Sequence, residues 1–266
     1  MRLFLMEKLH PIGGGTDYTK AEFAPRLAMG APRAGVGPTL RRAHFWPRSL
    51  PSHRKPAGGR CPYTQAMRVI GGELGSRRLR APRGLATRPS SDRLRQALFN
   101  ILGTAVRGRL FVDAFAGTGA VGIEAWSRGA RPVVWIEPDP VAARALRDNL
   151  DRLDIIGGSV LQRSLPAGLA ALERLLAVRA AGGCDFFFFD PPYADAAAYP
   201  AMLGALARRP GLARPGTCIV AETRRGLELP PRCGRLRRER VHPQGDSQLV
   251  FYAVEEEPAP GERGAA

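Results

Sequence analysis

Long apolar runs, paired cysteines and clustered histidines are all missing from this chain of 266 residues. No run of about 18 apolar residues occurs, so the sequence predicts neither a transmembrane helix nor a membrane partner. The four cysteines form no C-x-x-C pair, which argues against a disulfide framework and against a zinc site. The four histidines show no ligand spacing. We therefore expect a protein of a reducing compartment, the cytoplasm, with no bound metal and no catalytic histidine.

Acidic residues are too few to balance the basic ones, since 24 Asp and Glu stand against 40 Lys and Arg, a net charge of +16. Residues 1–66 and 67–109 each carry +8, whereas residues 110–254 carry +3 and residues 255–266 carry −3. A chain this basic often binds a polyanion, because each phosphate that it neutralises releases a counterion. A solvated basic surface in an arginine-rich proteome is the alternative, and the uneven placement favours a nucleic acid.

The two ends of the chain lack the pattern of folded elements. Residues 1–66 contain eight prolines and eight glycines without a sustained apolar period, which predicts a disordered basic extension. An organellar transit peptide is one alternative. We prefer another, in which Met67 is the true start and the preceding residues lie upstream of it. The acidic tail, residues 255–266, is also predicted to be disordered.

Residues 67–109 predict a basic β-hairpin followed by a helix. Residues 67–72 and 76–82 form two short strand-like segments around a glycine turn. Apolar residues then recur at positions 94, 97, 98, 101 and 102, the spacing of an amphipathic helix. Ser90 or Ser91 is available as its N-cap.

Residues 110–254 alternate between strand-like and helix-like segments. The candidate strands are residues 110–114, 132–137, 159–163, 184–190, 217–222 and 247–253. The candidate helices lie near residues 119–129, 140–153, 166–179 and 195–208. This alternation predicts a doubly wound, mostly parallel α/β sheet with helices on both faces. The segment around residues 235–253 lacks an intervening helix, so we expect an antiparallel pair there.

A glycine-rich turn links the first of these strands to its helix. Gly117, Gly119 and Gly122 follow the G-x-G-x-x-G pattern, which alone is a weak sign of a nucleotide site. Glycines let the backbone approach a ligand, and the helix N-terminus offers free N–H groups. Asp113 would repel a pyrophosphate but could accept from the ammonium of an amino-acid-bearing cofactor. The alternative for Asp113 is a helix cap.

Glu137 ends the second predicted strand, 20 residues after Gly117. An acidic residue at that distance accepts from ribose hydroxyls in nucleotide-binding units, which favours a cofactor containing adenosine. An exposed loop carboxylate is the alternative.

Asp190-Pro191-Pro192-Tyr193 follows a buried strand and decides between cofactors. An exocyclic amine on a base is a poor nucleophile, because its lone pair is delocalised into the ring. Asp190 and the Pro191 carbonyl could accept from that amine and favour a pyramidal nitrogen facing a methyl donor. Tyr193 offers an aromatic face for a flipped base. A simple Pro-Pro turn is the alternative.

These motifs resemble an S-adenosylmethionine-dependent amino-methyltransferase with a sheet of the seven-stranded type. Residues 67–72, 88–95 and 97–102 narrow the resemblance to the RsmD family, which methylates N2 of one guanine in bacterial 16S rRNA within the assembling small subunit. The resemblance covers residues 67–253. It implies that the cofactor binds to Asp113, Phe115, Gly117, Thr118, Gly119, Glu137 and Ser164. It implies that the target guanine meets the catalytic residues Asp190, Pro191, Pro192 and Tyr193.

Two residues depart from the family's pattern. Gln96 stands where the family has Glu, and Ser164 replaces an Asp that accepts from the adenine amino group. A serine hydroxyl accepts more weakly than a carboxylate, which bears on cofactor affinity rather than on reaction class.

The RNA contacts are expected on the hairpin and on residues 88–95 that follow it. Residues 88–95 would either cover the cofactor site or contact RNA. They are Arg68, Arg77, Arg78, Arg80, Arg83, Arg88 and Arg93. Arginines that contact phosphates give affinity without sequence choice. The expected partner is rRNA of the small ribosomal subunit or its precursor, bound by a monomer.

Three other functions remain open. A DNA adenine-N6 methyltransferase would use the same four residues, but the sequence has no sizeable target-recognition domain. A protein-glutamine methyltransferase has little use for the charge of residues 67–109. A non-enzymatic ribosome-assembly factor would leave Asp190 to Tyr193 without a role.

Overall fold

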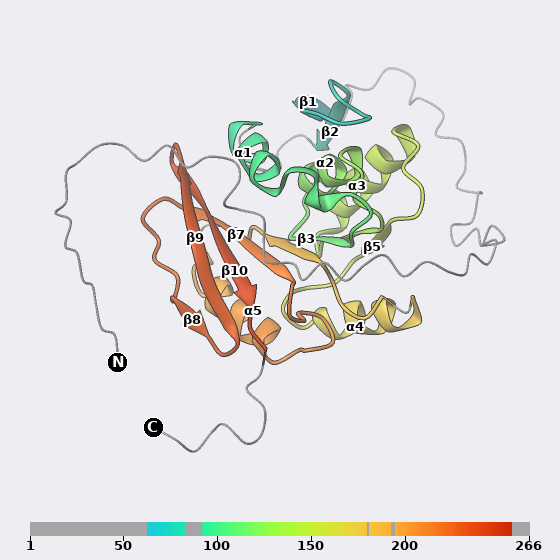
Figure 1. Ribbon diagram of the computed structural model, residues 1–266. Helices are drawn as coiled ribbons and strands as arrows, with labels where there is room; N and C mark the ends of the chain where they lie inside the picture. The colour runs from blue at the N-terminus through green and yellow to red at the C-terminus, as the bar shows by residue number, and fades with distance from the viewer. Residues whose placement is uncertain (1–62, 83–91, 180, 193–194, 257–266) are drawn as a thin grey trace, which may run out of the picture.

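The structure is a computed structural model that describes residues 63–82, 92–179, 181–192 and 195–256 (Figure 1). Strands β3 (Phe111–Ala114), β4 (Val133–Ile136), β5 (Ser159–Leu161), β6 (Phe186–Phe189) and β7 (Cys218–Arg224) alternate with four helices. These helices are α2 (Ala120–Ser127), α3 (Pro140–Arg152), α4 (Leu169–Val178) and α5 (Ala198–Ala207). Each lies within or beside the range that the sequence predicted.

The main sheet has the order β5-β4-β3-β6-β7-β10-β9-β8. The first five strands are parallel, and β10 (Ser247–Val254) runs antiparallel to β7. Strand β9 (Leu236–Gln244) forms a hairpin with β10, which confirms the predicted antiparallel pair. The sheet has eight strands rather than seven, because the short strand β8 (Arg232–Cys233) pairs with the start of β9.

Helices cover both faces of this sheet. Helices α4 and α5 pack on one face, while α1 (Asp92–Leu102), α2 and α3 pack on the other (Figure 1). The four phenylalanines of β6 show why its sequence has no polar interruption. Phe187 and Phe189 enter the core beneath α4 and α5, and Phe186 and Phe188 enter the opposite core. Each side chain buried in this way contributes about 1.5–3 kcal/mol.

The predicted hairpin is present, but its first strand is β1 (Tyr63–Arg68), which begins four residues before the expected segment 67–72, and its second strand is β2 (Arg78–Pro82). It packs against α2 and α3, and a short 3₁₀ helix (Gly103–Val106) links α1 to β3. Strand β1 starts at Tyr63, and Tyr63 and Thr64 pair with β2, so the disorder expected for residues 1–66 does not extend to this strand. Residues 1–62, Ser90 and Ser91 lie outside the described residues.

The start of the predicted disordered tail is also ordered. The backbone N–H of Glu255 donates to the Arg235 carbonyl at 2.8 Å, and its side chain pairs with Arg232 and Arg237. Residues 257–266 lie outside the description. Of the helices that the structure describes, none combines the length and apolar character needed to cross a membrane.

Candidate active site

The site lies where the central parallel strands end. Ala114 of β3 pairs with Phe189 of β6 and with Ile136 of β4, so all three strands end at the same level. The chain therefore leaves the sheet side by side at Phe115, Glu137 and Asp190. Parallel sheets bind ligands at this carboxyl edge, and the register thus brings together three sequence motifs that are far apart in the chain.

The three glycines after β3 serve two different purposes. Phe115 adopts φ 62°, Gly117 φ 54° and Gly119 φ 86°, and such angles are costly for a residue other than glycine. A Cβ on Gly119 would lie 2.3 Å from Leu146, and one on Gly122 would lie 2.2 Å from the Trp135 ring nitrogen. These two glycines allow α2 to pack closely. A Cβ on Gly117 would meet nothing within 4 Å, so Gly117 faces open space.

Asp113 lies at the base of this loop and is 1% exposed. Its Oδ2 accepts from the Gly122 N–H at 2.7 Å, which is the helix-capping contact considered as the alternative. Burial, with a smaller contribution from Glu137, raises the pKa of Asp113 to about 7, against the Gly122 hydrogen bond and the charge of Arg95. The cap engages one oxygen, and a carboxylate can accept further hydrogen bonds.

Glu137 is buried, which excludes the exposed loop carboxylate considered as its alternative. Its Oε2 accepts from the Gly117 N–H at 2.7 Å, and its Oε1 accepts from the Asp139 N–H at 2.8 Å. Burial raises the pKa of Glu137, although both hydrogen bonds oppose this change. Glu137 thereby ties the loop after β3 to the loop after β4. Thr118 is also buried, and its carbonyl accepts from Asn149 of α3 at 3.1 Å.

Asp190 and Pro191 follow β6, with Asp190 half-buried, Pro191 buried and Pro192 exposed. The Pro192 carbonyl accepts from the Asp195 N–H at 2.8 Å. Tyr193 lies outside the described residues, as do Arg83 and Arg88.

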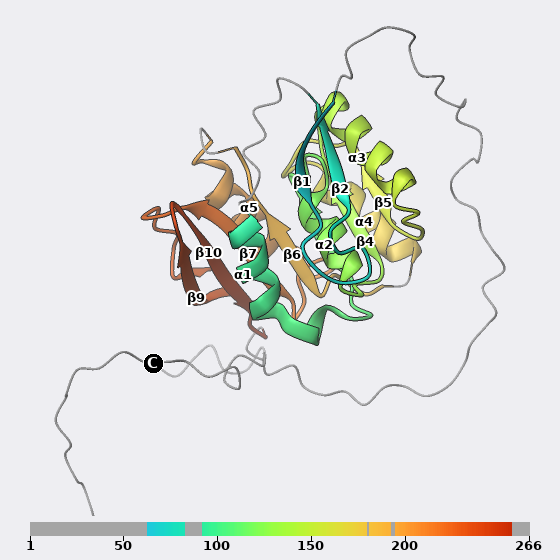
Figure 2. The same cartoon turned by 90° about the horizontal axis from the view of Figure 1, so that it is seen from above.

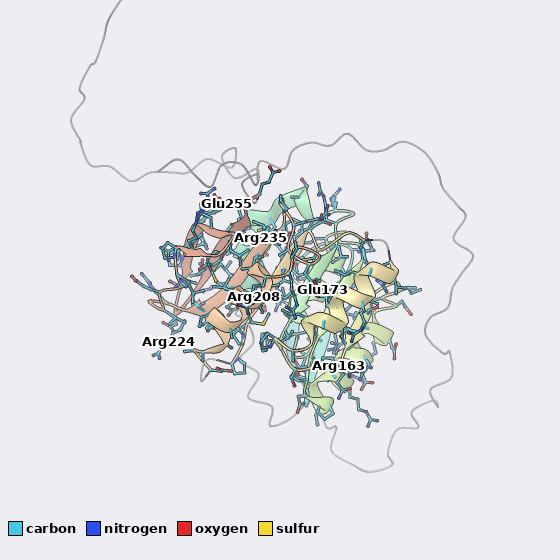
Figure 3. All side chains as sticks on the ribbon, turned by 90° about the horizontal axis from the view of Figure 1, so that it is seen from below. Arg163, Glu173, Arg208, Arg224, Arg235 and Glu255 are labelled. Atoms are coloured by element: carbon cyan, nitrogen blue, oxygen red, sulfur yellow. The ribbon has the colours of Figure 1, made fainter. Side chains whose placement is uncertain are left out.

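Ser164 lies three residues beyond β5 and is exposed. Its carbonyl accepts from the Gly168 N–H at 2.7 Å, which orders the turn before α4. Figure 3 shows the neighbouring Arg163 and Arg224 of β7 on the side of the molecule away from Glu255. Because β5 runs parallel to β4, Ser164 lies at the same carboxyl edge of the sheet as the glycine loop.

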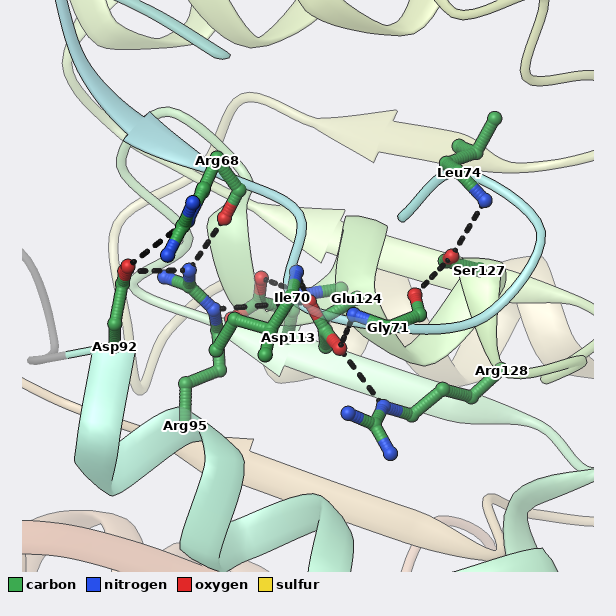
Figure 4. A network of polar contacts seen from close by, with 11 residues as sticks. Arg68, Ile70, Gly71, Leu74, Asp92, Arg95, Asp113, Glu124, Ser127 and Arg128 are labelled. Atoms are coloured by element: carbon green, nitrogen blue, oxygen red, sulfur yellow. Dashed lines mark hydrogen bonds and ion pairs between the residues drawn. The ribbon is translucent and has the colours of Figure 1, made fainter. Parts of the chain in front are cut away.

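The sequence interpretation missed a buried polar network that holds the hairpin (Figure 4). Glu124 of α2 accepts from the N–H groups of Ile70 and Gly71 at 2.7 and 2.9 Å, and from Arg128 at 2.8 Å. Arg95 of α1 is 1% exposed. Its Nη2 donates to the Arg68 carbonyl at 2.6 Å, and its Nε lies 3.9 Å from Glu124.

Most of the predicted RNA-contacting arginines that the structure describes are exposed. Arg77, Arg78 and Arg93 are exposed and Arg80 is half-buried. The Arg68 side chain is 67% exposed and lies 3.7 Å from Asp92. The backbone of Arg80 exchanges two hydrogen bonds with the Asn149 side chain of α3, so α3 fixes the second strand of the hairpin.

Comparison with known proteins gives a consistent result. Residues 67–253 match the family described as "Conserved hypothetical protein 95". YlbH of Bacillus subtilis is 33% identical over 70% of this chain and 98% of its own length. Ribosomal RNA small subunit methyltransferase D of Escherichia coli K12 is 30% identical over 75% of this chain and 94% of its own. A hypothetical protein of Thermus thermophilus with a solved structure is 31% identical with a TM-score of 0.57, covering 71% of this chain and 99% of that one. The chain therefore belongs to the RsmD family, as its motifs suggested.

Proposed function

We propose that this chain methylates the exocyclic N2 amine of a guanine in 16S rRNA, with S-adenosylmethionine as the methyl donor. The observation that carries the proposal is the meeting of the glycine loop, Glu137 and Asp190 at one edge of the sheet. A relative named for rRNA of the small subunit supports RNA over DNA or protein as the substrate.

The residues at this edge suit S-adenosylmethionine. The space above Gly117 allows close approach of a ligand to the backbone. Glu137 uses two acceptor positions on backbone N–H groups, which leaves about two for ribose hydroxyls. Asp113 would accept from the cofactor's ammonium group, with Phe115, Thr118 and Gly119 shaping the loop. Ser164 would accept from the adenine amine.

The proposed role of Asp190 is to bind the amine of the substrate guanine. S-adenosylmethionine, when bound, supplies a methyl group on a positively charged sulfur. Asp190 and the Pro191 carbonyl would accept the two N–H bonds of the guanine amine, and no donor in the described part of the chain engages that carbonyl. Holding both hydrogens favours a pyramidal nitrogen with an available lone pair. Pro192 stiffens the loop and Tyr193 would stack on the base, so catalysis is mainly positioning.

We also propose that the protein acts as a cytoplasmic monomer on the small subunit or its precursor. One chain supplies both the cofactor loop and Asp190, so the site needs no second subunit. The exposed arginines of the hairpin and of α1 would bind rRNA phosphates.

Label transfer to defined substrates tests the proposal. The full chain is incubated with methyl-labelled S-adenosylmethionine and small-subunit particles from a strain that lacks the modification. We expect label in N2-methylguanine after nuclease digestion, and none in DNA or in particles that are already modified. Label in N6-methyladenine, or in ribosomal protein, would contradict the proposed substrate.

Cofactor affinity should weaken below neutral pH. Burial raises the pKa of Asp113 to about 7, so the carboxylate that would accept from the ammonium is progressively lost as the pH falls. For one proton, we expect the dissociation constant of S-adenosylhomocysteine, which carries the same amino-acid group, to rise roughly tenfold between pH 7 and pH 5.5. Isothermal titration calorimetry at several pH values measures this dissociation constant.

The sign of the stability effect separates this prediction from acid unfolding. Because the pKa of Asp113 is raised in the folded state, its ionisation costs stability as the pH rises from about 4 towards 7. Acid therefore does not unfold the protein through Asp113. Asp113→Asn, which keeps an acceptor for Gly122, should bind weakly at all these pH values. A wild-type affinity that stays constant from pH 7 to 5.5 would contradict the role of Asp113.

A further inference from the structure

A second basic segment lies near the C-terminal end of the sheet. Residues 224–242 contain seven arginines and only two acidic residues. Acidic residues elsewhere in residues 110–254 offset the positive charge of this segment, so the whole range carries a net charge of only +3. The segment spans the end of β7 and most of the strand β9.

The structure uses the arginines at one end of this segment internally. Arg232 and Arg237 pair with Glu255, and Arg237 also pairs with Glu239. Arg235 donates to the Ala207 carbonyl at 3.0 Å, and Arg238 donates to the Leu229 carbonyl at 2.7 Å. These four arginines lie near the start of β9, at the end of the sheet opposite the glycine loop. Their charge is neutralised or satisfied locally.

The arginines at the other end are placed differently. Arg224 is the last residue of β7, and Arg225 follows it. Both are exposed, and neither forms an ion pair within the ranges that the structure describes, although Arg225 donates to the Gly245 carbonyl at 3.5 Å. Ala221 pairs with Phe189, the residue before Asp190, so Arg224 lies just beyond the carboxyl edge of the sheet. Figure 3 shows Arg224 on the side of the molecule away from Glu255.

Strand register adds two β9 residues to the same face of the sheet. Phe251 pairs with Arg240 and Leu249 with His242, while Ser247 pairs with Arg224. Side chains of directly opposed residues project to the same face, and Leu249 and Phe251 belong to the core beneath α1. Arg240 and His242 are half-buried there. Burial and the charge of Arg240 lower the pKa of His242, which favours its neutral form.

We infer that Arg224, Arg225, Arg240 and His242, here called the β7–β9 surface, bind single-stranded rRNA next to the target nucleotide. The inference rests on the proposed function. The β1–β2 hairpin lies on one side of α1 and the β9–β10 hairpin lies on the other (Figure 2). RNA held by the β1–β2 hairpin alone is fixed on one side of the extruded base. The β7–β9 surface fixes the other side.

Extrusion of a base explains why two surfaces are needed. A base taken out of its stack loses a few kcal/mol of stacking and pairing, and contacts to the flanking phosphates compensate for that loss. Arg224 and Arg225 provide charges for phosphates on the Asp190 side of the site. The neutral His242 ring beside Arg240 provides a flat surface and a hydrogen-bonding edge for an unpaired nucleotide.

Charge reversal at matched positions tests this inference. The test variant is R224E/R225E. The control variant is R174E/R208E, which reverses two exposed arginines on α4 and at the end of α5, on the other face of the sheet. Both variants change the net charge equally. We measure methyl transfer to unmodified small-subunit particles over a range of particle and salt concentrations, and binding to a short single-stranded RNA by fluorescence anisotropy.

We expect R224E/R225E to lower kcat/KM for the particle and the RNA affinity at least tenfold. The plot of the logarithm of the RNA association constant against the logarithm of the salt concentration should become less steep by about 1.4, because two phosphate contacts are lost. The control should stay within about twofold after correction for its bulk charge effect. Affinity for S-adenosylhomocysteine should be unchanged in both variants. R224Q/R225Q, which removes the charges without reversing them, should show a smaller loss in the same direction.

Two results would overturn the inference. One is an equal loss in the test and control variants, which indicates net charge rather than a surface. The other is unchanged RNA affinity and salt slope in R224E/R225E. Failure of the proposed function gives a different pattern, since wild-type protein would then transfer no methyl group to the particle. The anisotropy measurement, which needs no catalysis, would still decide whether the β7–β9 surface binds RNA.

Discussion

Asp190→Ala is expected to reduce kcat for methyl transfer by about a thousandfold, a loss typical of removing one preorganised polar contact to the reacting group. The reason is that Asp190 would hold one hydrogen of the target amine, and alanine leaves the nitrogen planar and weakly nucleophilic. Affinity for S-adenosylhomocysteine should change less than threefold, because the proposed cofactor contacts come from β3 and from the segments that follow β3, β4 and β5. Single-turnover kinetics with small-subunit particles measures the chemical step.

Two further variants make this prediction specific. Asp190→Asn keeps one acceptor oxygen, so we expect its rate to lie between those of the wild type and Asp190→Ala. Asp195→Ala removes a nearby exposed carboxylate whose Oδ1 accepts from the Ala198 N–H at the start of α5. It should retain at least a third of the wild-type rate. Equal losses in Asp190→Ala and Asp195→Ala, or a parallel loss of cofactor affinity, would contradict the role of Asp190.

The fold could be predicted because local patterns and core packing agree. The run Phe186–Phe189 has no polar interruption, and the structure buries it on both faces between two layers of helices. The antiparallel pair of β9 and β10 was recognisable from the missing helix between them. Strand β8 was not recognisable, because its two residues form a strand only by pairing with β9.

The site could be predicted in part, for a similar reason. Gly117, Glu137 and Asp190 each follow a predicted parallel strand, and topology brings such positions to one edge. Contacts between side chains and distant backbone groups have no such signal. Glu124 accepts from the backbone of Ile70 and Gly71 only because the hairpin packs on α2.

Arg95 shows the limit of the periodic pattern. Positions 94, 97, 98, 101 and 102 defined the predicted apolar face of α1, whereas the structure buries Leu94, Arg95, Leu98, Phe99 and Leu102. The buried face of α1 is rotated about the helix axis relative to the predicted apolar face, because α1 packs between the β1–β2 hairpin and the sheet. A residue outside the apolar stripe therefore becomes enclosed. Arginine is rarely fully buried in proteins, so the sequence predicts an exposed position for it.

Arg95→Met should destabilise the protein by about 3–5 kcal/mol, the usual effect of removing one partner from a buried ion pair. The change removes the hydrogen bond to the Arg68 carbonyl and leaves Glu124 with Arg128 as its remaining counterion. Urea denaturation followed by circular dichroism measures the free energy of unfolding. Arg93→Met, an exposed change on the same helix, should stay within about 0.5 kcal/mol of the wild type.

A second substitution measures how strongly Arg95 and Glu124 are coupled. Glu124→Gln keeps an oxygen that can accept from Ile70 or Gly71 but removes the buried negative charge. The loss of stability in Arg95→Met/Glu124→Gln should therefore be smaller than the sum of the losses in the two single variants. Arg95 also opposes the burial that raises the pKa of Asp113. The pH below which cofactor affinity declines should move upward in Arg95→Met, whereas a purely structural loss would leave that pH unchanged.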